Sequence, residues 1–156
     1  MKVFKTLKET TADGPGVRYA VYVSGCEHHC KGCHNPQTWD FEAGTELDIY
    51  QIKAEIAANS LLDGLTVSGG EPLHPRNVDD TLRLLSEFQD MNIWLFTGYL
   101  YEDIQKDPKQ SQCLQYVDVL VDGPYVESER ILEDIDFRGS ANQRILHVEK
   151  LEERTA

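Results

Sequence analysis

Short apolar runs alternate along the chain with segments in which apolar residues recur at helical spacing. The runs are rich in β-branched and aromatic residues and end at or near glycine, which predicts buried strands. They cover residues 17–23, 65–68, 92–97 and 117–121, with one more possible strand over 145–148. After a start at Thr45 and Asp48, Ile49, Ile52 and Ile56 follow at helical spacing and predict a helix of about three or four turns.

A second helical stripe follows the second predicted strand. Asn77 caps this helix, whose apolar residues are Val78, Leu82, Leu85 and Phe88. A weaker helical pattern covers residues 101–106. Alternating strands and helices build a parallel sheet with right-handed crossovers, and about five or six strands cannot close an eight-stranded barrel. The sequence therefore predicts an α/β fold, an incomplete parallel β/α barrel that forms a single domain over residues 1–156.

Cysteine, glycine and polar residues follow four of the predicted strands. These segments are Cys26 to Cys33, Ser68 to Pro72, Thr97 to Tyr99 and Asp122 to Tyr125. In parallel barrels and open α/β sheets the carboxyl ends of the strands carry the functional site. We therefore expect the four segments to gather at one end of the sheet.

The net charge of the chain argues against one class of binding partner. Fifteen basic and 27 acidic side chains give a formal net charge of -12, which repels a phosphate backbone and argues against direct nucleic-acid binding. We expect the acidic stretch 127–136 to be a solvated face. No apolar run approaches the roughly 20 residues of a membrane span, and residues 1–10 lack the apolar core of a secretory signal. The sequence predicts a cytoplasmic protein.

Three of the four cysteines lie on one short loop. Cys26, Cys30 and Cys33 are clustered, whereas Cys113 stands alone far downstream. In a reducing compartment such clustering indicates metal or redox chemistry more than structural disulfides. A four-iron cubane takes one ligand per iron, so three cysteines leave one iron open to bind and activate a substrate.

Spacing alone leaves two alternatives open. His28, His29 or His34 could complete a Cys3His zinc site, although structural zinc sites usually collect their ligands from two separated pairs. Cys113 could be a distant fourth ligand, as an electron carrier requires, or a buried core thiol. Outside the zinc alternative, we expect His28 and His29 to be solvated loop residues.

The cysteine loop, followed about forty residues later by Ser68-Gly-Gly-Glu-Pro72, resembles the radical S-adenosylmethionine superfamily. The resemblance implies that Cys26, Cys30 and Cys33 hold a [4Fe-4S] cluster and that Gly69, Gly70 and Glu71 bind S-adenosylmethionine through its methionyl amino group. A glycine pair exposes backbone to a ligand at close range, and a carboxylate suits an ammonium group.

Within that superfamily, the segments 13–18 and 33–40 resemble the activating enzymes of glycyl-radical proteins. Two kinds of activase share them, those of pyruvate formate-lyase and those of anaerobic ribonucleoside-triphosphate reductase. The segments 94–99, 117–125 and 137–143 resemble the reductase activases, and this resemblance covers nearly the whole chain. It implies two partners: the large subunit of that reductase, which receives a glycyl radical, and a one-electron reductant such as a flavodoxin-type protein.

The resemblance also assigns residues around the third cysteine. The superfamily often has an aromatic residue before this cysteine, where the chain has Gly32. We expect His34 to take over that packing, against the adenine or the cluster, and Gly32, Cys33 and His34 to contact the cofactor through backbone groups as well as side chains. No catalytic residue is expected beyond the cluster and the cofactor. Arg138, Asn142 and Gln143 are candidates to bind cofactor or partner, or to fix the tail.

Overall fold

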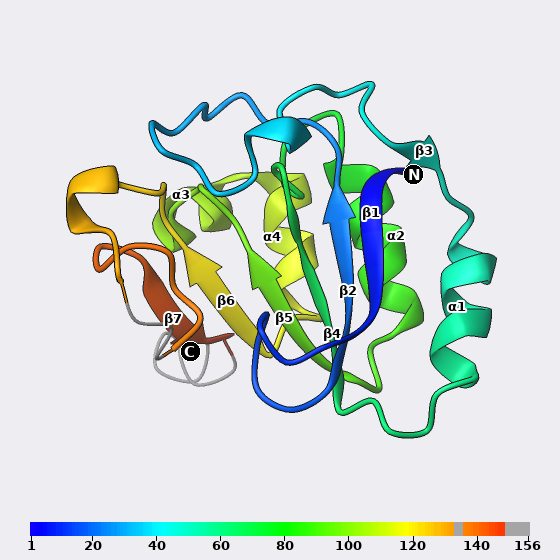
Figure 1. Cartoon of the computed structure of the whole chain (residues 1–156). Helices are drawn as coiled ribbons and strands as arrows, with labels where there is room; N and C mark the ends of the chain where they lie inside the picture. Colours follow the sequence, from blue (N-terminus) through cyan, green and yellow to red (C-terminus); the bar gives the residue numbers. More distant parts are fainter. Residues whose placement is uncertain (133–135, 149–156) are drawn as a thin grey trace.

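The computed structural model describes residues 1–132 and 136–148 as one mixed α/β layer structure (Figure 1). Its seven-stranded sheet has the order β3-β1-β2-β4-β5-β6-β7. The strands are β1 (Lys2–Thr10), β2 (Arg18–Val23), β3 (Thr45–Glu46), β4 (Gly64–Gly69), β5 (Asn92–Phe96), β6 (Val119–Asp122) and β7 (Arg144–His147). The four central strands, β2, β4, β5 and β6, are parallel, whereas β1, β3 and β7 pair antiparallel.

The four central strands confirm the runs predicted from the sequence, and β7 confirms the possible strand near the C-terminus. A purely parallel sheet was the wrong prediction, because the antiparallel strands β1 and β7 flank the parallel core. Strand β1 was not predicted, because it has no continuous apolar run. Lysines, threonines and a glutamate alternate with its few apolar residues, and the strand is largely half-buried.

The helices are α1 (Ile49–Ala57), α2 (Val78–Glu87), α3 (Tyr101–Lys106) and α4 (Pro108–Leu114), with 3-10 turns η1 (Pro36–Thr38) and η2 (Glu127–Glu129). Helix α1 is shorter than predicted because Thr45 lies in β3 and the cap is Asp48, whose carboxylate accepts the Tyr50 amide. Helix α4 follows α3 directly and was not predicted, since its seven residues carry few apolar side chains.

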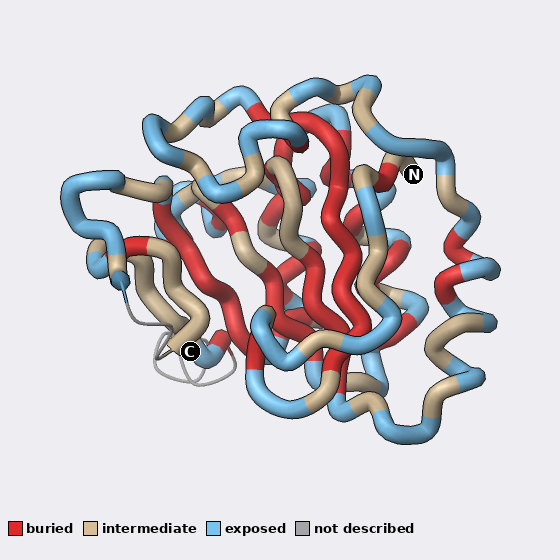
Figure 2. The backbone as a smooth tube through the Cα atoms, in the orientation of Figure 1, coloured by how far each residue is buried: buried red, intermediate tan, exposed pale blue. Residues whose placement is uncertain are grey.

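The two faces of the sheet differ in what covers them. The four helices of the described residues contribute to one apolar core that packs against alternate residues of the central strands, such as Val21, Val67 and Leu95. The opposite face carries a small cluster of Trp94, Val119 and Val121, and none of the described helices lies over it (Figure 1). The central strands are buried along most of their length, whereas the loops above them are largely exposed (Figure 2). In the described residues, no helix is long and apolar enough to cross a membrane.

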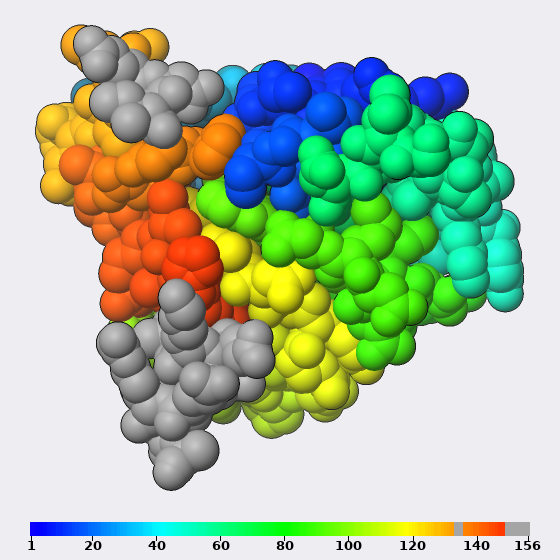
Figure 3. Space-filling model, turned by 90° about the horizontal axis from the view of Figure 1, so that it is seen from below, coloured from blue at the N-terminus to red at the C-terminus, as the bar shows by residue number. Residues whose placement is uncertain are grey.

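Arg18 fixes the amino ends of the parallel strands. Its side chain is 1% exposed, and its guanidinium donates to Thr66 Oγ1 at 2.8 Å, to the Pro15 carbonyl at 2.9 Å and to the Asn92 carbonyl at 2.9 Å. Asp63 joins the same end, where its carboxylate accepts the Val17 amide at 2.9 Å. In the view from below, the loop after β1 lies against the turn before β4 (Figure 3).

Candidate functional site

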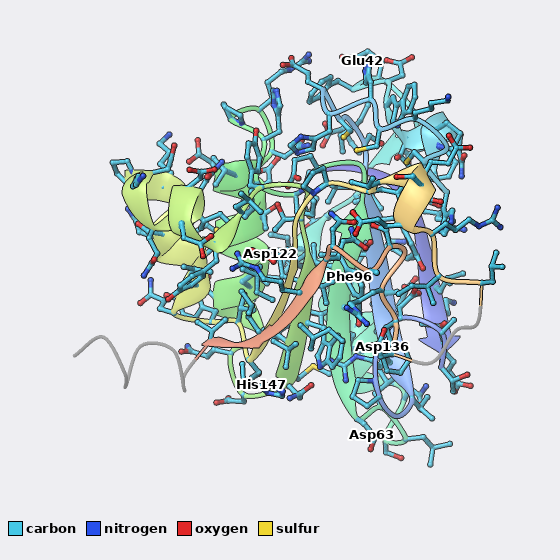
Figure 4. The ribbon with its side chains drawn as sticks, turned by 90° about the vertical axis from the view of Figure 1, so that its left-hand side faces the viewer. Glu42, Asp63, Phe96, Asp122, Asp136 and His147 are labelled. Atoms are coloured by element: carbon cyan, nitrogen blue, oxygen red, sulfur yellow. The ribbon has the colours of Figure 1, made fainter. Side chains whose placement is uncertain are left out.

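The carboxyl ends of the four parallel strands line one cavity of about 340 Å³. All four segments that the sequence analysis expected at this end contribute to it. Its lining includes Cys26, Cys30, Cys33, Ser68, Gly69, Gly70, Thr97, Gly98, Gly123 and Tyr125. Glu42 lies at this end of the molecule, and Asp63 and His147 lie at the other end (Figure 4). The topology therefore brings the cysteine loop and the glycine-rich loop to one site.

The three loop thiols differ in burial. Cys26 is buried, whereas Cys30 and Cys33 are half-buried. Burial raises the pKa of the Cys26 thiol to about 11 and also raises the pKa of Cys30. Because a metal binds the thiolate, loading this loop with iron releases protons. Cys113 is buried in α4, where desolvation raises its pKa to about 12, and it does not line the cavity. It is a core thiol.

The ends of the cysteine loop are fixed by backbone hydrogen bonds. The amide of Gly25 donates to the Thr38 carbonyl at 2.7 Å, and that of Cys26 donates to the Trp39 carbonyl at 3.1 Å. Thr38 Oγ1 in turn donates to the Asn35 carbonyl at 2.6 Å. The segment after the third cysteine therefore folds back and holds the entry to the loop.

Glu71 is the buried hub of the site. Its side chain is 1% exposed, and its carboxylate accepts hydrogen bonds from the amides of Leu73 at 2.8 Å and Gly98 at 2.7 Å. Thr97 Oγ1 and His28 Nε2 lie 2.9 and 2.8 Å from its two oxygens. The superfamily resemblance implied an ammonium partner for this carboxylate; in the structure the carboxylate accepts hydrogen bonds from the chain itself, and Glu71 does not line the cavity.

His28 contradicts the expectation of a solvated loop residue. Its side chain is 22% exposed, its ring meets the Tyr99 ring edge-on at 4.7 Å, and the hydrogen bond to Glu71 raises its pKa above the ordinary value. The ring passes so close to Gly98 that a Cβ there would lie 2.7 Å from it. Only the glycine leaves room for His28 to reach Glu71. His29 is exposed and stacks on Trp39, with ring centroids 4.5 Å apart.

Asn77 joins the two functional loops. It occupies the N-cap position of α2 as predicted, but its side chain makes no capping hydrogen bond. Instead, Nδ2 donates to the carbonyl of Ser24, just before the cysteine loop, at 3.1 Å and to the carbonyl of Glu71 at 2.9 Å. A cap signal in the sequence thus marked a residue that positions the site.

Two other predicted cofactor contacts, Gly32 and His34, are exposed and lie in different places. His34 lines the cavity and its ring centroid lies 4.9 Å from that of Tyr125. Gly32 does not line the cavity; its φ is +76°, and a Cβ there would lie 2.9 Å from the Glu127 side chain. Of the predicted set, the residues brought together around the cavity are Cys26, Cys30, Cys33, His34, Gly69 and Gly70.

The three polar residues near the C-terminus fix the tail. Arg138 forms an ion pair with Asp136 at 2.8 Å and donates to the Gln143 carbonyl. Asn142 donates to the Pro124 carbonyl at 2.8 Å, and Gln143 donates to the Gly123 carbonyl at 3.0 Å. These contacts hold the segment 136–143 against the end of β6, where Gln143 also lines the cavity.

The donor set fits an iron–sulfur cluster better than a single ion. Among the residues that the structure describes, no three His, Cys, Asp or Glu side chains are arranged to hold one metal ion. Three thiols nevertheless line the same cavity from one loop. A cubane takes one thiolate per iron and so accepts sulfur ligands spread over a larger volume than a single ion does.

Comparison with known proteins agrees with this class of site. The family model of a 4Fe-4S single cluster domain matches residues 12–146, which include the cysteine loop. Anaerobic ribonucleoside-triphosphate reductase-activating proteins are similar to the chain over most of its length. The protein of Haemophilus influenzae is 42% identical over 149 residues, which cover 89% of the chain and 92% of the relative. Those of phage T4 and Escherichia coli K12 are 40% and 36% identical, over 85% and 87% of the chain and 85% and 92% of the relatives.

The chain belongs to the family of anaerobic ribonucleoside-triphosphate reductase-activating proteins. The resemblance of the downstream segments to the reductase activases, and not to those of pyruvate formate-lyase, is thereby confirmed.

Proposed function

We propose that this chain cleaves S-adenosylmethionine reductively and generates a glycyl radical on anaerobic ribonucleoside-triphosphate reductase. One electron from a reductant such as a flavodoxin-type protein breaks the sulfonium–carbon bond, which gives methionine and a 5′-deoxyadenosyl radical. That radical takes a hydrogen atom from a backbone glycine of the large reductase subunit and becomes 5′-deoxyadenosine. We further propose that residues 1–156 form one cytoplasmic radical S-adenosylmethionine domain, an incomplete β/α barrel.

The observation that carries this proposal is the shared cavity. Three thiols from the loop after β2 and the glycine pair after β4 line the same 340 Å³ space. When bound there, the [4Fe-4S] cluster and S-adenosylmethionine supply the electron transfer and the radical chemistry, as cofactors do in general. The placement of the four described helices, α1 to α4, on one face of the sheet supports the incomplete-barrel assignment.

Residues of the chain itself bind the cluster and position the loops that form the cavity. Cys26, Cys30 and Cys33 are the proposed iron ligands. Gly69 and Gly70 line the cavity at the end of β4, and a Cβ on Gly70 would lie 2.4 Å from the Gly25 carbonyl. Glu71 acts as a positioning residue, because its carboxylate joins the cysteine loop to the end of β5.

The face of the sheet that carries no described helix is the proposed entrance for the reductase. Phe96 and Phe137 line the cavity from this side and pack against the small cluster around Trp94. Since no described helix closes this face, a glycine loop of another protein can approach the cavity there (Figure 1). The partner then completes the pocket and excludes water from it.

Anaerobic reconstitution tests the proposal. The chain should take up about four irons and turn brown, and its spectrum should change when S-adenosylmethionine binds. Mixed with reductant, S-adenosylmethionine and the reductase, it should give a glycyl radical signal in electron paramagnetic resonance, whereas pyruvate formate-lyase should give none. Stoichiometric zinc without visible absorption would refute the cluster. Equal activation of the lyase would refute the choice of partner.

Cysteine variants test the ligand assignment. Cys26→Ala, Cys30→Ala or Cys33→Ala should each abolish cleavage of S-adenosylmethionine, because a cubane held by two thiolates is poorly retained. Cys113→Ala is the matched control and should still bind the cluster, although its cavity in the core costs some stability. If Cys113→Ala lost the cluster while one loop cysteine proved dispensable, the assignment would be wrong.

A further inference from the structure

Two cavities follow one another along the face of the sheet that carries no described helix. Residues two apart in a strand share a face, so Trp94 and Phe96 of β5 point to the same side, as do Val119 and Val121 of β6. The first residue of each pair lines a second cavity, of about 550 Å³, whereas the second residue lines the cavity of the cysteine loop. The two cavities therefore lie one after the other along β5 and β6, with the second cavity nearer the amino ends of the strands.

Phe137 lies where the two cavities meet. Its ring lines the cavity of the cysteine loop and contacts the Trp94 ring of the second cavity edge-on, with ring centroids 5.5 Å apart. Phe96 and Ile145, which pack against the same apolar cluster, belong to strands of the sheet. Phe137 instead reaches this cluster from the segment 136–143, which places an aromatic ring against the face of the sheet.

The backbone of Phe137 has an unusual conformation. Its φ is +75°, in the left-handed region that bulky residues rarely adopt because of steric crowding around Cβ. The residues on its two sides are joined to each other, since the Asp136 carboxylate accepts the Arg138 amide at 3.4 Å and pairs with the Arg138 guanidinium at 2.8 Å. Unfavourable backbone conformations persist where the surrounding contacts enforce them, and they are concentrated at functional sites. The conformation of Phe137 therefore indicates a function for the position of its ring.

We propose that Phe137 contacts the glycine-bearing segment of the reductase and limits how deeply that segment enters the cavity. The inference deepens the proposed function and rests on it. A partner that approaches from the face without described helices meets the apolar cluster to which Phe137 belongs. An aromatic ring offers a large contact area and loses little conformational entropy on binding, so it is suited to position a backbone. Phe137 is then a specificity-determining residue that places the glycine hydrogen within reach of the radical.

The decisive variant is Phe137→Ala in the reconstituted protein. With the reductase present, the number of glycyl radicals formed per 5′-deoxyadenosine should fall about tenfold, because a small misplacement of the reacting atoms is costly. Without the reductase, cleavage of S-adenosylmethionine by a chemical reductant should stay within about twofold of the wild type, since the interaction lost is one with the reductase alone. A merely structural role would lower both. Phe137→Leu, which keeps an apolar side chain of similar size, should recover most of the coupling.

Tyr50→Ala is the control for these measurements. Tyr50 is 67% exposed on α1, which packs on the other face of the sheet. Its replacement should change neither the radical yield per 5′-deoxyadenosine nor the cleavage without reductase.

A photochemical cross-link tests the contact without turnover. In the reconstituted protein without reductant, 4-azidophenylalanine at position 137 should, on irradiation with the reductase, label the peptide that contains the glycine, as identified by mass spectrometry. The same probe at position 50 should not label that peptide.

The outcomes separate the inference from the proposed function. If Phe137→Ala couples as well as the wild type, or if the probe at position 137 labels only other parts of the reductase, the inference is wrong while the proposed function stands. Loss of cleavage without the reductase would assign Phe137 a structural role and equally overturn the inference. If Phe137→Ala does not fold, the cross-link decides alone. If the wild-type chain forms no radical on the reductase, the proposed function itself fails.

Discussion

Replacing Glu71 with glutamine should destabilise the protein, even though the side chains have nearly the same shape. Each carboxylate oxygen accepts one backbone amide, Oε1 that of Gly98 at 2.7 Å and Oε2 that of Leu73 at 2.8 Å. A glutamine amide group must place its NH2 at one of the two positions. In either orientation it sets a donor against a backbone donor in a site that is fully buried.

The magnitude follows from the number of backbone amides that lose their acceptor. A buried donor left unsatisfied costs about 1–3 kcal/mol. Glu71→Gln leaves one such amide and should lower the free energy of unfolding by about 1–3 kcal/mol. Glu71→Ala leaves both and should lower it by about 2–6 kcal/mol, a large part of the roughly 5–15 kcal/mol of a typical domain. The lost contacts of Thr97 and His28 add to this cost.

Urea denaturation of the iron-free protein, followed by circular dichroism, measures both variants without interference from the cluster. Glu129→Gln is the control, because Glu129 is exposed on η2 and its replacement removes the same charge. The control should unfold within about 0.5 kcal/mol of the wild type. A Glu71→Gln variant as stable as the control would show that the carboxylate is not the hub described above.

Two further predictions concern arginine contacts outside the site. Arg144 holds the pKa of Glu102 at about 2, mainly through two hydrogen bonds, so the pair stabilises the fold above pH 4.5 and loses its effect as the pH falls toward 2. Because Glu102 is largely exposed, Glu102→Gln should cost less than about 1 kcal/mol in urea denaturation at neutral pH, and this cost should shrink as the pH falls from 4.5 toward 2; a cost that stayed constant over this range would contradict this origin. Arg18→Lys should lower the free energy of unfolding by at least about 1.5–3 kcal/mol, since lysine cannot reach Thr66, Pro15 and Asn92 together, and wild-type stability would refute this role.

The central sheet could be predicted because its strands are buried on both faces. Runs such as 17–23 and 92–97 are apolar nearly throughout, and this pattern depends little on the rest of the structure. Strand β1 pairs with β2 but is largely half-buried, so charged and apolar residues mix along it and no period stands out. Strand β1 was therefore missed, and with it the antiparallel pairing on this side of the parallel core.

The site could be predicted where its residues are close in sequence or follow the ends of the parallel strands. The spacing of Cys26, Cys30 and Cys33 is local, and the strand ends that surround them follow from the alternation of strands and helices. The hydrogen-bond network of Glu71 is different, because its donors come from three separate segments whose approach is visible only in the folded chain. The superfamily resemblance implied an ammonium partner for this carboxylate and gave no sign of the donors that the chain itself supplies to it in its buried position.

These hydrogen bonds also show which part of the iron-free site has the fewest stabilising contacts. The cysteine loop contains neither helix nor strand between β2 and η1. Its entry is fixed by Asn77 and by backbone bonds around Cys26, and its middle is held through His28. Cys30 and Cys33 lie beyond these anchors and are half-buried. Local opening costs least where buried contacts are few, so iron should contribute most to the order of the loop around the second and third thiols.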